Sequence, residues 1–233
     1  MASMNLRQAR KRLSQWRLGL TSSRYESSGR GAGVISTGQD DAGGKSYGEY
    51  QLSSRAGTLQ AYLAQSSYGQ RFAGLEPGTS AFDTMWKRIA ASEPGFAQDQ
   101  HDFIGRTHYD AQLTRLREAG IDLAAAGYAV HDMLWSTAVQ YGALTLSIVT
   151  KALRTAFGAT VGASTLTDAQ IVTAVQDYKL AHVDTLFAHS KPLWPGLRRR
   201  IGDEKRDLLR LADAERIVVE ADRTATDRAA RSA

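Results

Sequence analysis

The stretch that decides the fold is YESSGRGAGVISTGQDDAGGKSYGEYQLSS, residues 25–54. Its short apolar runs, GVIST at 33–37 and SYGEYQLSS at 46–54, are typical of β-strands. The DDAGG sequence between them is typical of a turn. We therefore expect a small glycine-rich β-hairpin in residues 25–54, with Glu26 at its entrance and the neighbouring Asp40 and Asp41 at its turn.

The remainder of the chain has the apolar spacing of helices. Residues 5–20 place Leu6, Ala9, Leu13, Trp16 and Leu20 on one face of a basic amphipathic helix. Residues 129–153 are apolar nearly all round, which predicts a buried central helix. Further helices are expected over 79–92, 95–120, 167–190 and 197–222. Ser80 and Asp83 are expected to form a capping box at the start of the first of these, and Thr167 to cap the third. The fold class expected is therefore mainly α (α+β), a helical bundle with one small hairpin.

Composition limits the function classes. The 233 residues contain no cysteine, which excludes disulfides, thiolate metal sites and cysteine nucleophiles. No window resembles a transmembrane helix or a secretory signal. The net charge of +5 favours anionic partners such as nucleic acid, lipid head groups or an acidic cell-wall polymer, although a solvated basic surface explains it equally.

The carboxylates of residues 25–54 are the first candidates for chemistry. Glycoside cleavage needs one acid that protonates the leaving oxygen and a second carboxylate that activates water or stabilises the sugar cation. Glu26, Asp40 and Asp41 have the right chemical type for this. Spacing alone favours a surface Glu26 and aspartates that only form a turn, because turn signals of this type are frequent.

The same residues resemble a known family. The pattern from Tyr25 to Ser54, followed by HDFIGRTHYD at 101–110 and MLWSTAVQYG at 133–142, is similar to lysozyme-like peptidoglycan hydrolases (muramidases). These occur as phage lysins (endolysins) and as C-terminal effector domains of type VI secretion spike proteins, and they also look chitosanase-like. The resemblance covers roughly residues 20–212. It implies that Glu26 is the proton donor and that Asp41 is the second essential carboxylate, with Asp40 as the alternative because it stands where we expect glycine.

Substrate-binding residues are also expected. In the arrangement that the resemblance implies, a hairpin covers a sugar-binding groove, so Ser46, Tyr47 and Gln51 can contact sugar hydroxyl and acetamido groups. Tyr47 is as compatible with simple packing as with stacking on a sugar ring. Gln140 and Tyr141, in the apolar helix, present the same choice, because a buried amide needs partners that a groove floor would supply.

These observations predict a single lysozyme-like catalytic domain over 1–233, with a basic helix at about 5–20, a catalytic hairpin at about 25–54 and a helical body at about 58–222. It would cleave the glycan strands of bacterial peptidoglycan, with inversion and without a cofactor. A metal site at His101 and His108 is weakly supported, since a third ligand at suitable spacing is missing. The alternatives are a lytic transglycosylase, a chitosanase, or a non-catalytic tail or baseplate domain that grips glycan.

The expected partners follow from the same hypothesis. They are peptidoglycan, an anionic outer-membrane surface, delivery machinery and a cognate immunity protein, but no nucleic acid. The protein would be made in the cytoplasm without a signal peptide and would act in the periplasm or on the cell wall after release or delivery.

Overall fold

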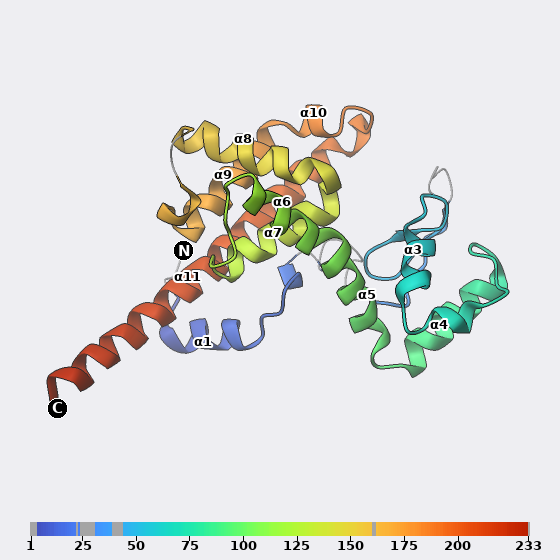
Figure 1. Cartoon of the computed structure of the whole chain (residues 1–233), viewed down its shortest axis with the longest axis horizontal. Coiled ribbons are helices and arrows are strands. Elements are labelled where there is room, and N and C mark those ends of the chain that lie inside the picture. The colour runs from blue at the N-terminus through green and yellow to red at the C-terminus, as the bar shows by residue number, and fades with distance from the viewer. Residues whose placement is uncertain (1–3, 22, 24–30, 39–43, 160–161, 233) are drawn as a thin grey trace. The chain divides into compact units, whose positions relative to one another are not determined.

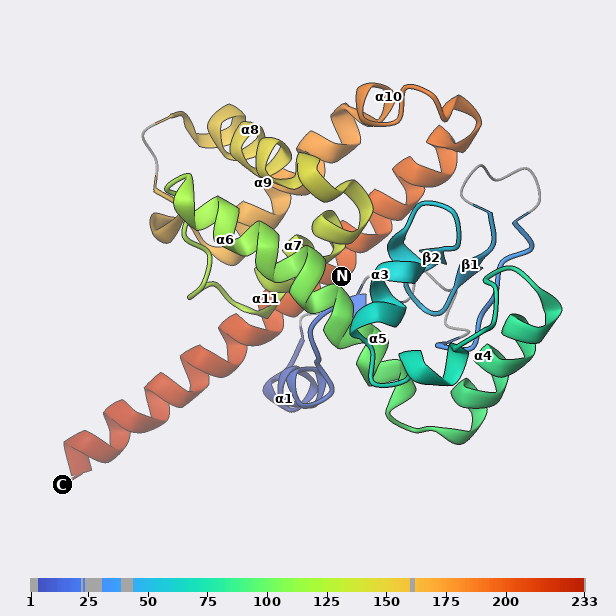
Figure 2. The ribbon, with the colours of Figure 1, turned by 45° about the vertical axis from the view of Figure 1, so that its right-hand side comes forward.

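The computed structural model describes residues 4–21, 23, 31–38, 44–159 and 162–232. The chain divides into two compact units, unit 1 (Met1–Thr21 and Gln112–Ala233) and unit 2 (Ser22–Ala111). The prediction of one domain stays a prediction. The prediction of a mainly α fold with one small hairpin is confirmed (Figures 1 and 2).

Unit 2 contains the hairpin and short helices that surround an aromatic core. Strands β1 (Ser46–Tyr47) and β2 (Leu52–Ser53) pair antiparallel. The other elements are α3 (Thr58–Gln65), η1 (Gly69–Phe72), α4 (Ser80–Ser92), α5 (Phe96–Ile104) and the π-helical turn η2 (Gly105–Tyr109). The core consists mainly of aromatic rings, which include Tyr47, Tyr62, Phe72, Phe82, Trp86, Phe96 and Phe103.

The hairpin is shorter than predicted. Its turn is Gly48–Gln51, inside the segment SYGEYQLSS, and GVIST contributes only an isolated bridge between Ile35 and Tyr47. The Ser36 amide donates to the Ser46 carbonyl (2.8 Å) and the Gly48 amide donates to the Val34 carbonyl (2.7 Å). The two predicted segments therefore do lie side by side, but the regular pairing, two residues on each strand, is between β1 and β2 inside SYGEYQLSS.

Unit 1 is a helical bundle. Its elements are α1 (Leu6–Ser14), α6 (Asp110–Glu118, which begins in unit 2), α7 (Tyr128–Tyr141), η3 (Gly142–Leu144), α8 (Thr145–Phe157), η4 (Ala163–Thr165), α9 (Asp168–Ala181), α10 (Val183–Leu186), η5 (Lys191–Leu193) and α11 (Trp194–Ser232). Ten residues of α7 are buried, as predicted for the central helix. Helix α11 packs against α1, α7 and α9 (Figure 1). None of the described helices is both long and apolar enough to cross a membrane.

Several helix boundaries differ from the predictions. Helix α1 ends at Ser14 instead of Leu20, since Trp16 leaves the helix and stacks on Tyr128 with ring centroids 4.0 Å apart. The predicted central helix divides at Gly142, whose φ of 52° is outside the helical range. The last helix continues to Ser232 instead of ending near Asp222.

Helix caps follow the expected side-chain chemistry. Thr167 caps α9 and forms a reciprocal capping box with Gln170, as its position before the helix predicts. At α4 the cap is Thr79 and not the predicted Ser80. Asp83, which the sequence placed in that capping box, instead faces the hairpin.

Candidate functional site

The three predicted carboxylates, Glu26, Asp40 and Asp41, lie outside the described residues. What the structure describes is the chain on both sides of each. This flanking chain makes specific hydrogen bonds with buried side chains.

The chain before Glu26 is anchored by Asp132 of α7. The Asp132 carboxylate accepts hydrogen bonds from the Gly19 amide (2.8 Å), the Thr21 amide (3.1 Å) and the Thr21 hydroxyl (2.5 Å). Asp132 has no exposed surface. Burial raises its pKa to about 6, although these hydrogen bonds favour the ionised form. A buried carboxylate thus holds the backbone five to seven residues ahead of Glu26.

The chain after Glu26 is anchored in unit 2. The Ala32 carbonyl accepts hydrogen bonds from the Trp86 indole (2.8 Å) and the Gln100 side-chain amide (3.3 Å). Trp86 and Gln100 have no exposed surface, so these are interior contacts. The described chain that follows Glu26 is therefore anchored in the interior of unit 2.

Gly38 and Gly44 flank the segment that contains Asp40 and Asp41. Their φ values are +66° and +72°, a conformation that favours glycine. A Cβ on Gly38 would lie 2.6 Å from the Lys45 nitrogen and 2.7 Å from the Gly44 carbonyl carbon. The backbone on the two sides of the aspartates therefore approaches too closely for any side chain.

The same two glycines line a pocket of about 540 Å³ in unit 2. Polar side chains of the hairpin and of the following helix also line it, among them Lys45, Arg55 and Gln60. Glu76 and the turn that leads to α4 also line it. Cations, a carboxylate and an amide in one concave surface have the chemistry needed to bind a polar ligand.

Asp83 joins the hairpin to α4. One of its oxygens contacts the Lys45 ammonium (2.6 Å), and the other accepts a hydrogen bond from the Tyr47 hydroxyl (2.6 Å). The same hydroxyl accepts a hydrogen bond from the Gly78 amide (2.8 Å). Burial, and then the hydrogen bond to Asp83, raise the pKa of the Tyr47 phenol. This network keeps Lys45 at the pocket and fixes the base of the hairpin.

Tyr47 itself is a packing residue. Its side chain has no exposed surface, and its ring contacts Phe82 and Trp86 edge to face, at centroid distances of 5.1 Å and 5.3 Å. Of the two interpretations left open, these contacts favour packing over stacking on a sugar. Ser46 is also buried, and its amide donates to the Ser36 hydroxyl (2.7 Å).

Gln51 has an unusual backbone. Its φ is 53°, which makes it the one non-glycine with positive φ among the described residues. Its side-chain amide donates to the Gly48 carbonyl (3.0 Å) and so closes the hairpin turn. A positive φ strains the backbone of a residue that is not glycine. Strain of this kind persists where the surrounding structure enforces it, frequently at functional sites. A role for Gln51 in substrate binding stays a prediction.

Gln140 and Tyr141 lie in unit 1, at the end of α7, whereas Ser46, Tyr47 and Gln51 lie in unit 2. The Tyr141 ring contacts Phe187 at 5.4 Å and lies 5.3 Å from the Lys179 ammonium. Burial, and then the nearby Glu204, raise the pKa of the Tyr141 phenol. Gln140 is half-buried. Their contact with glycan also stays a prediction.

Sequence reasoning missed the buried charges of unit 1. Lys179 and Glu204 have no exposed surface, and their charged groups lie 3.6 Å apart. Burial lowers the pKa of Lys179, while Glu204 opposes that shift. For Asp132 a signal existed, because it is a single acid inside the apolar run AVHDMLW. The pairing of Lys179 with Glu204 had no signal, since it joins two different helices.

The histidines considered for a metal site have other contacts. His101 Nδ1 lies 2.7 Å from the Tyr50 hydroxyl, and His108 Nδ1 lies 2.8 Å from the Thr107 hydroxyl. Burial lowers the pKa of His108. Across the described part of the chain, no three His, Asp or Glu side chains form a group that could hold a metal ion.

Comparison with known proteins gives both a sequence family and a fold. Over 199 residues the chain is 45% identical to the type VI secretion system spike protein VgrG3 of Vibrio cholerae serotype O1, an alignment that covers 84% of this chain and 19% of that protein. This chain thus spans about one fifth of that relative.

The fold is shared with a solved structure, the native chitosanase from Bacillus subtilis MY002. The TM-score is 0.57 at 14% identity, covering 86% of this chain and 88% of the chitosanase. A second structure, a glutamate-to-alanine variant of the same chitosanase in complex with 6 GlcN, matches equally well. The family model for the type VI secretion system spike protein VgrG3-like C-terminal region matches residues 18–205, and the chain belongs to this family.

Proposed function

We propose that this chain is a glycosidase domain that cleaves the glycan strands of bacterial peptidoglycan, with Glu26 as general acid and Asp41 as the second carboxylate. The observation that carries the proposal is the position of Gly38 and Gly44, which flank the paired aspartates and line a polar pocket. The chitosanase that shares this fold supports it, because a variant of that enzyme lacking one glutamate holds 6 GlcN.

The proposed reaction proceeds with inversion. The Glu26 carboxylic acid protonates the glycosidic oxygen, and the Asp41 carboxylate removes a proton from the water that attacks the anomeric carbon from the opposite face. No cofactor is needed for these steps. Lys45 and Arg55, which line the pocket, would contact the polar groups of the glycan.

Delivery by a type VI secretion spike is part of the proposal. Membership of the VgrG3-like C-terminal family supports this route over release as a phage lysin. The substrate is then reached in the periplasm of a target cell, and a cognate immunity protein would protect the producing cell.

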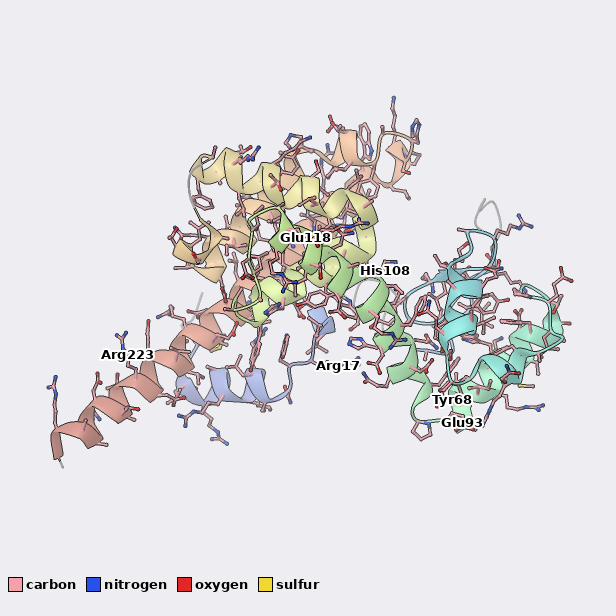
Figure 3. All side chains as sticks on the ribbon, viewed as in Figure 1. Arg17, Tyr68, Glu93, His108, Glu118 and Arg223 are labelled. Carbon is pink, nitrogen blue, oxygen red and sulfur yellow. The ribbon has the colours of Figure 1, made fainter. Side chains whose placement is uncertain are left out.

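The first test is hydrolysis of purified peptidoglycan by the wild type, by Glu26→Gln and by the control Glu118→Gln, which changes an exposed glutamate at the end of α6 (Figure 3). We expect Glu26→Gln to lose roughly 10²–10⁴-fold in rate, the usual contribution of a general acid. The control should retain full activity. Equal rates for wild type and Glu26→Gln would refute the assignment.

The aspartates distinguish the chemical alternatives. If Asp41 is the base, Asp41→Asn should lose activity while Asp40→Asn retains most of it. A lytic transglycosylase would tolerate both changes and would release anhydro-sugar ends, which mass spectrometry separates from hydrolysis products by the mass of one water. Turnover of chitosan without turnover of peptidoglycan would identify a chitosanase. Glycan binding without any turnover would identify a non-catalytic domain.

A further inference from the structure

The net positive charge of this protein comes from one short segment. Residues 4–20 contain five basic residues, Arg7, Arg10, Lys11, Arg12 and Arg17, and no acidic residue. The chain has 29 Lys and Arg and 24 Asp and Glu, so 24 basic residues remain elsewhere and balance the 24 acidic residues. The excess of +5 is therefore local to α1 and the residues that follow it.

Helix α1 displays this charge because its apolar side is covered. Ala9 is buried and Leu6 and Leu13 are half-buried, and α1 packs against α11 (Figures 1 and 2). Arg7 and Lys11, one helical turn apart, are exposed on the same side. Figure 3 shows Arg17 in the segment after α1 and Arg223 on the C-terminal part of α11.

Few of these cations are neutralised by α11. Arg10 forms an ion pair with Asp222 (2.7 Å), while Asp213 and Glu220 both contact Arg216 of their own helix. Within the described part of the chain, Arg7, Lys11 and Arg12 have no ion pair. Three cations are thus available to an external anion.

Helix α1 lies outside the residues that the family model matches. The family model matches residues 18–205, which leaves out α1 and the part of α11 after residue 205. The Arg10–Asp222 ion pair joins two such segments. Helix α1 and its ion pair with α11 therefore lie outside the residues that the family model matches.

We propose that α1 docks this protein on an anionic phospholipid surface by electrostatic attraction. A cluster of four to eight Lys and Arg on an amphipathic helix is typical of binding to anionic lipid head groups. Insertion into the bilayer is not involved, because α11 already covers the apolar side of α1. Docking would keep the enzyme at the membrane that borders its proposed substrate.

A lipid surface fits the short helix better than nucleic acid does. Nine residues of helix span about 13 Å, at 1.5 Å per residue. Over that length a duplex strand offers roughly four phosphates, at 3.4 Å each, that curve away from a straight helix. A bilayer presents a flat surface on which anionic lipids can gather below every exposed cation.

The test is co-sedimentation of the whole chain with vesicles that contain phosphatidylglycerol, compared with vesicles of phosphatidylcholine alone. We expect binding to the first only, with strong weakening by salt. The triple variant Arg7→Gln, Lys11→Gln, Arg12→Gln should bind roughly 100-fold less tightly, at a factor of about five per charge. Glutamine keeps the helical propensity, and circular dichroism checks the fold.

The matched control is Lys87→Gln, Arg117→Gln, Arg154→Gln, which removes the same charge from exposed positions of three other helices. It should bind phosphatidylglycerol vesicles like the wild type. Equal weakening in both triple variants would overturn the proposal, because the effect would then follow net charge. Binding to duplex DNA or isolated peptidoglycan sacculi, with none to the vesicles, would also overturn it. Cleavage of soluble glycan fragments should be unchanged in the α1 variant, which separates this proposal from that for Glu26.

Discussion

The two units differ in what they bury. Five aromatic side chains without exposed surface, those of Tyr47, Tyr62, Phe82, Trp86 and Phe96, lie in unit 2, whereas unit 1 has only Trp135 among the described residues. Conversely, in the described part of the chain every charged side chain without exposed surface lies in unit 1. These side chains are Asp132, Lys179 and Glu204. Unit 2 is therefore stabilised mainly by the packing of aromatic rings, whereas the stability of unit 1 depends on buried charges and hence on pH.

The largest effect should come from the centre of the aromatic core. Trp86 contacts the rings of Tyr47, Tyr62 and Phe96. We expect Trp86→Ala to lower the free energy of unfolding by about 4 kcal/mol, because it leaves a large cavity. Urea denaturation measures this loss, and Lys87→Ala, one residue further on an exposed site, is the control. A loss below about 1 kcal/mol would show that ring packing does not stabilise unit 2.

The next effect is the pH dependence of unit 1. The pKa of Asp132 is raised from 3.8 to about 6, so the folded state binds its proton more tightly than the unfolded state does. Stability from this group is complete below pH 4 and is lost as the pH rises through 6. The shift corresponds to about 3 kcal/mol at 1.36 kcal/mol per unit.

Asp132→Asn removes this titration. In the wild type, the free energy of unfolding should fall between pH 4 and pH 7 in part because Asp132 loses its proton. That part of the fall should be missing in the variant. Amide hydrogen exchange can assign the difference to unit 1. Asp99→Asn is a comparison from unit 2, where Asp99 bonds to the Ser66 and Ser67 hydroxyls. A pH profile of Asp132→Asn identical to that of the wild type would contradict the assignment.

The smallest effect concerns the polar atom in the aromatic core. Tyr47→Phe keeps the ring contacts but removes the hydroxyl that bonds to Asp83 and Gly78. We expect a loss of about 1–2 kcal/mol, the usual cost of leaving buried groups without their partner. Thermal unfolding would measure it, with Tyr128→Phe as control since that side chain is 38% exposed. A loss as large as that of Trp86→Ala would mean that the polar network, and not ring packing, determines the stability of unit 2.

Much of the fold could be predicted from the sequence because it depends on local chemistry. Apolar spacing predicted α4, α7 and α9, and the Thr167 cap placed the start of α9 correctly. Boundaries were less predictable. The end of α1 at Ser14 depends on the stacking of Trp16 on Tyr128, a contact between residues more than one hundred positions apart.

The candidate site likewise has some features that the sequence predicts and others that only the tertiary structure decides. The order of Glu26, Asp40, Asp41 and the glycines around them is a property of the sequence. It indicated the C-terminal domains of type VI secretion spike proteins, among which this chain belongs, together with phage lysins, which stay a prediction. Tyr47 could not be assigned from the sequence, since burial decides between packing and sugar contact. Only the tertiary structure brings Asp83 of α4 to Lys45 and Tyr47, and Asp132 of α7 to Gly19 and Thr21. These contacts join distant segments, and no local pattern encodes them because their energy appears only when both segments have folded.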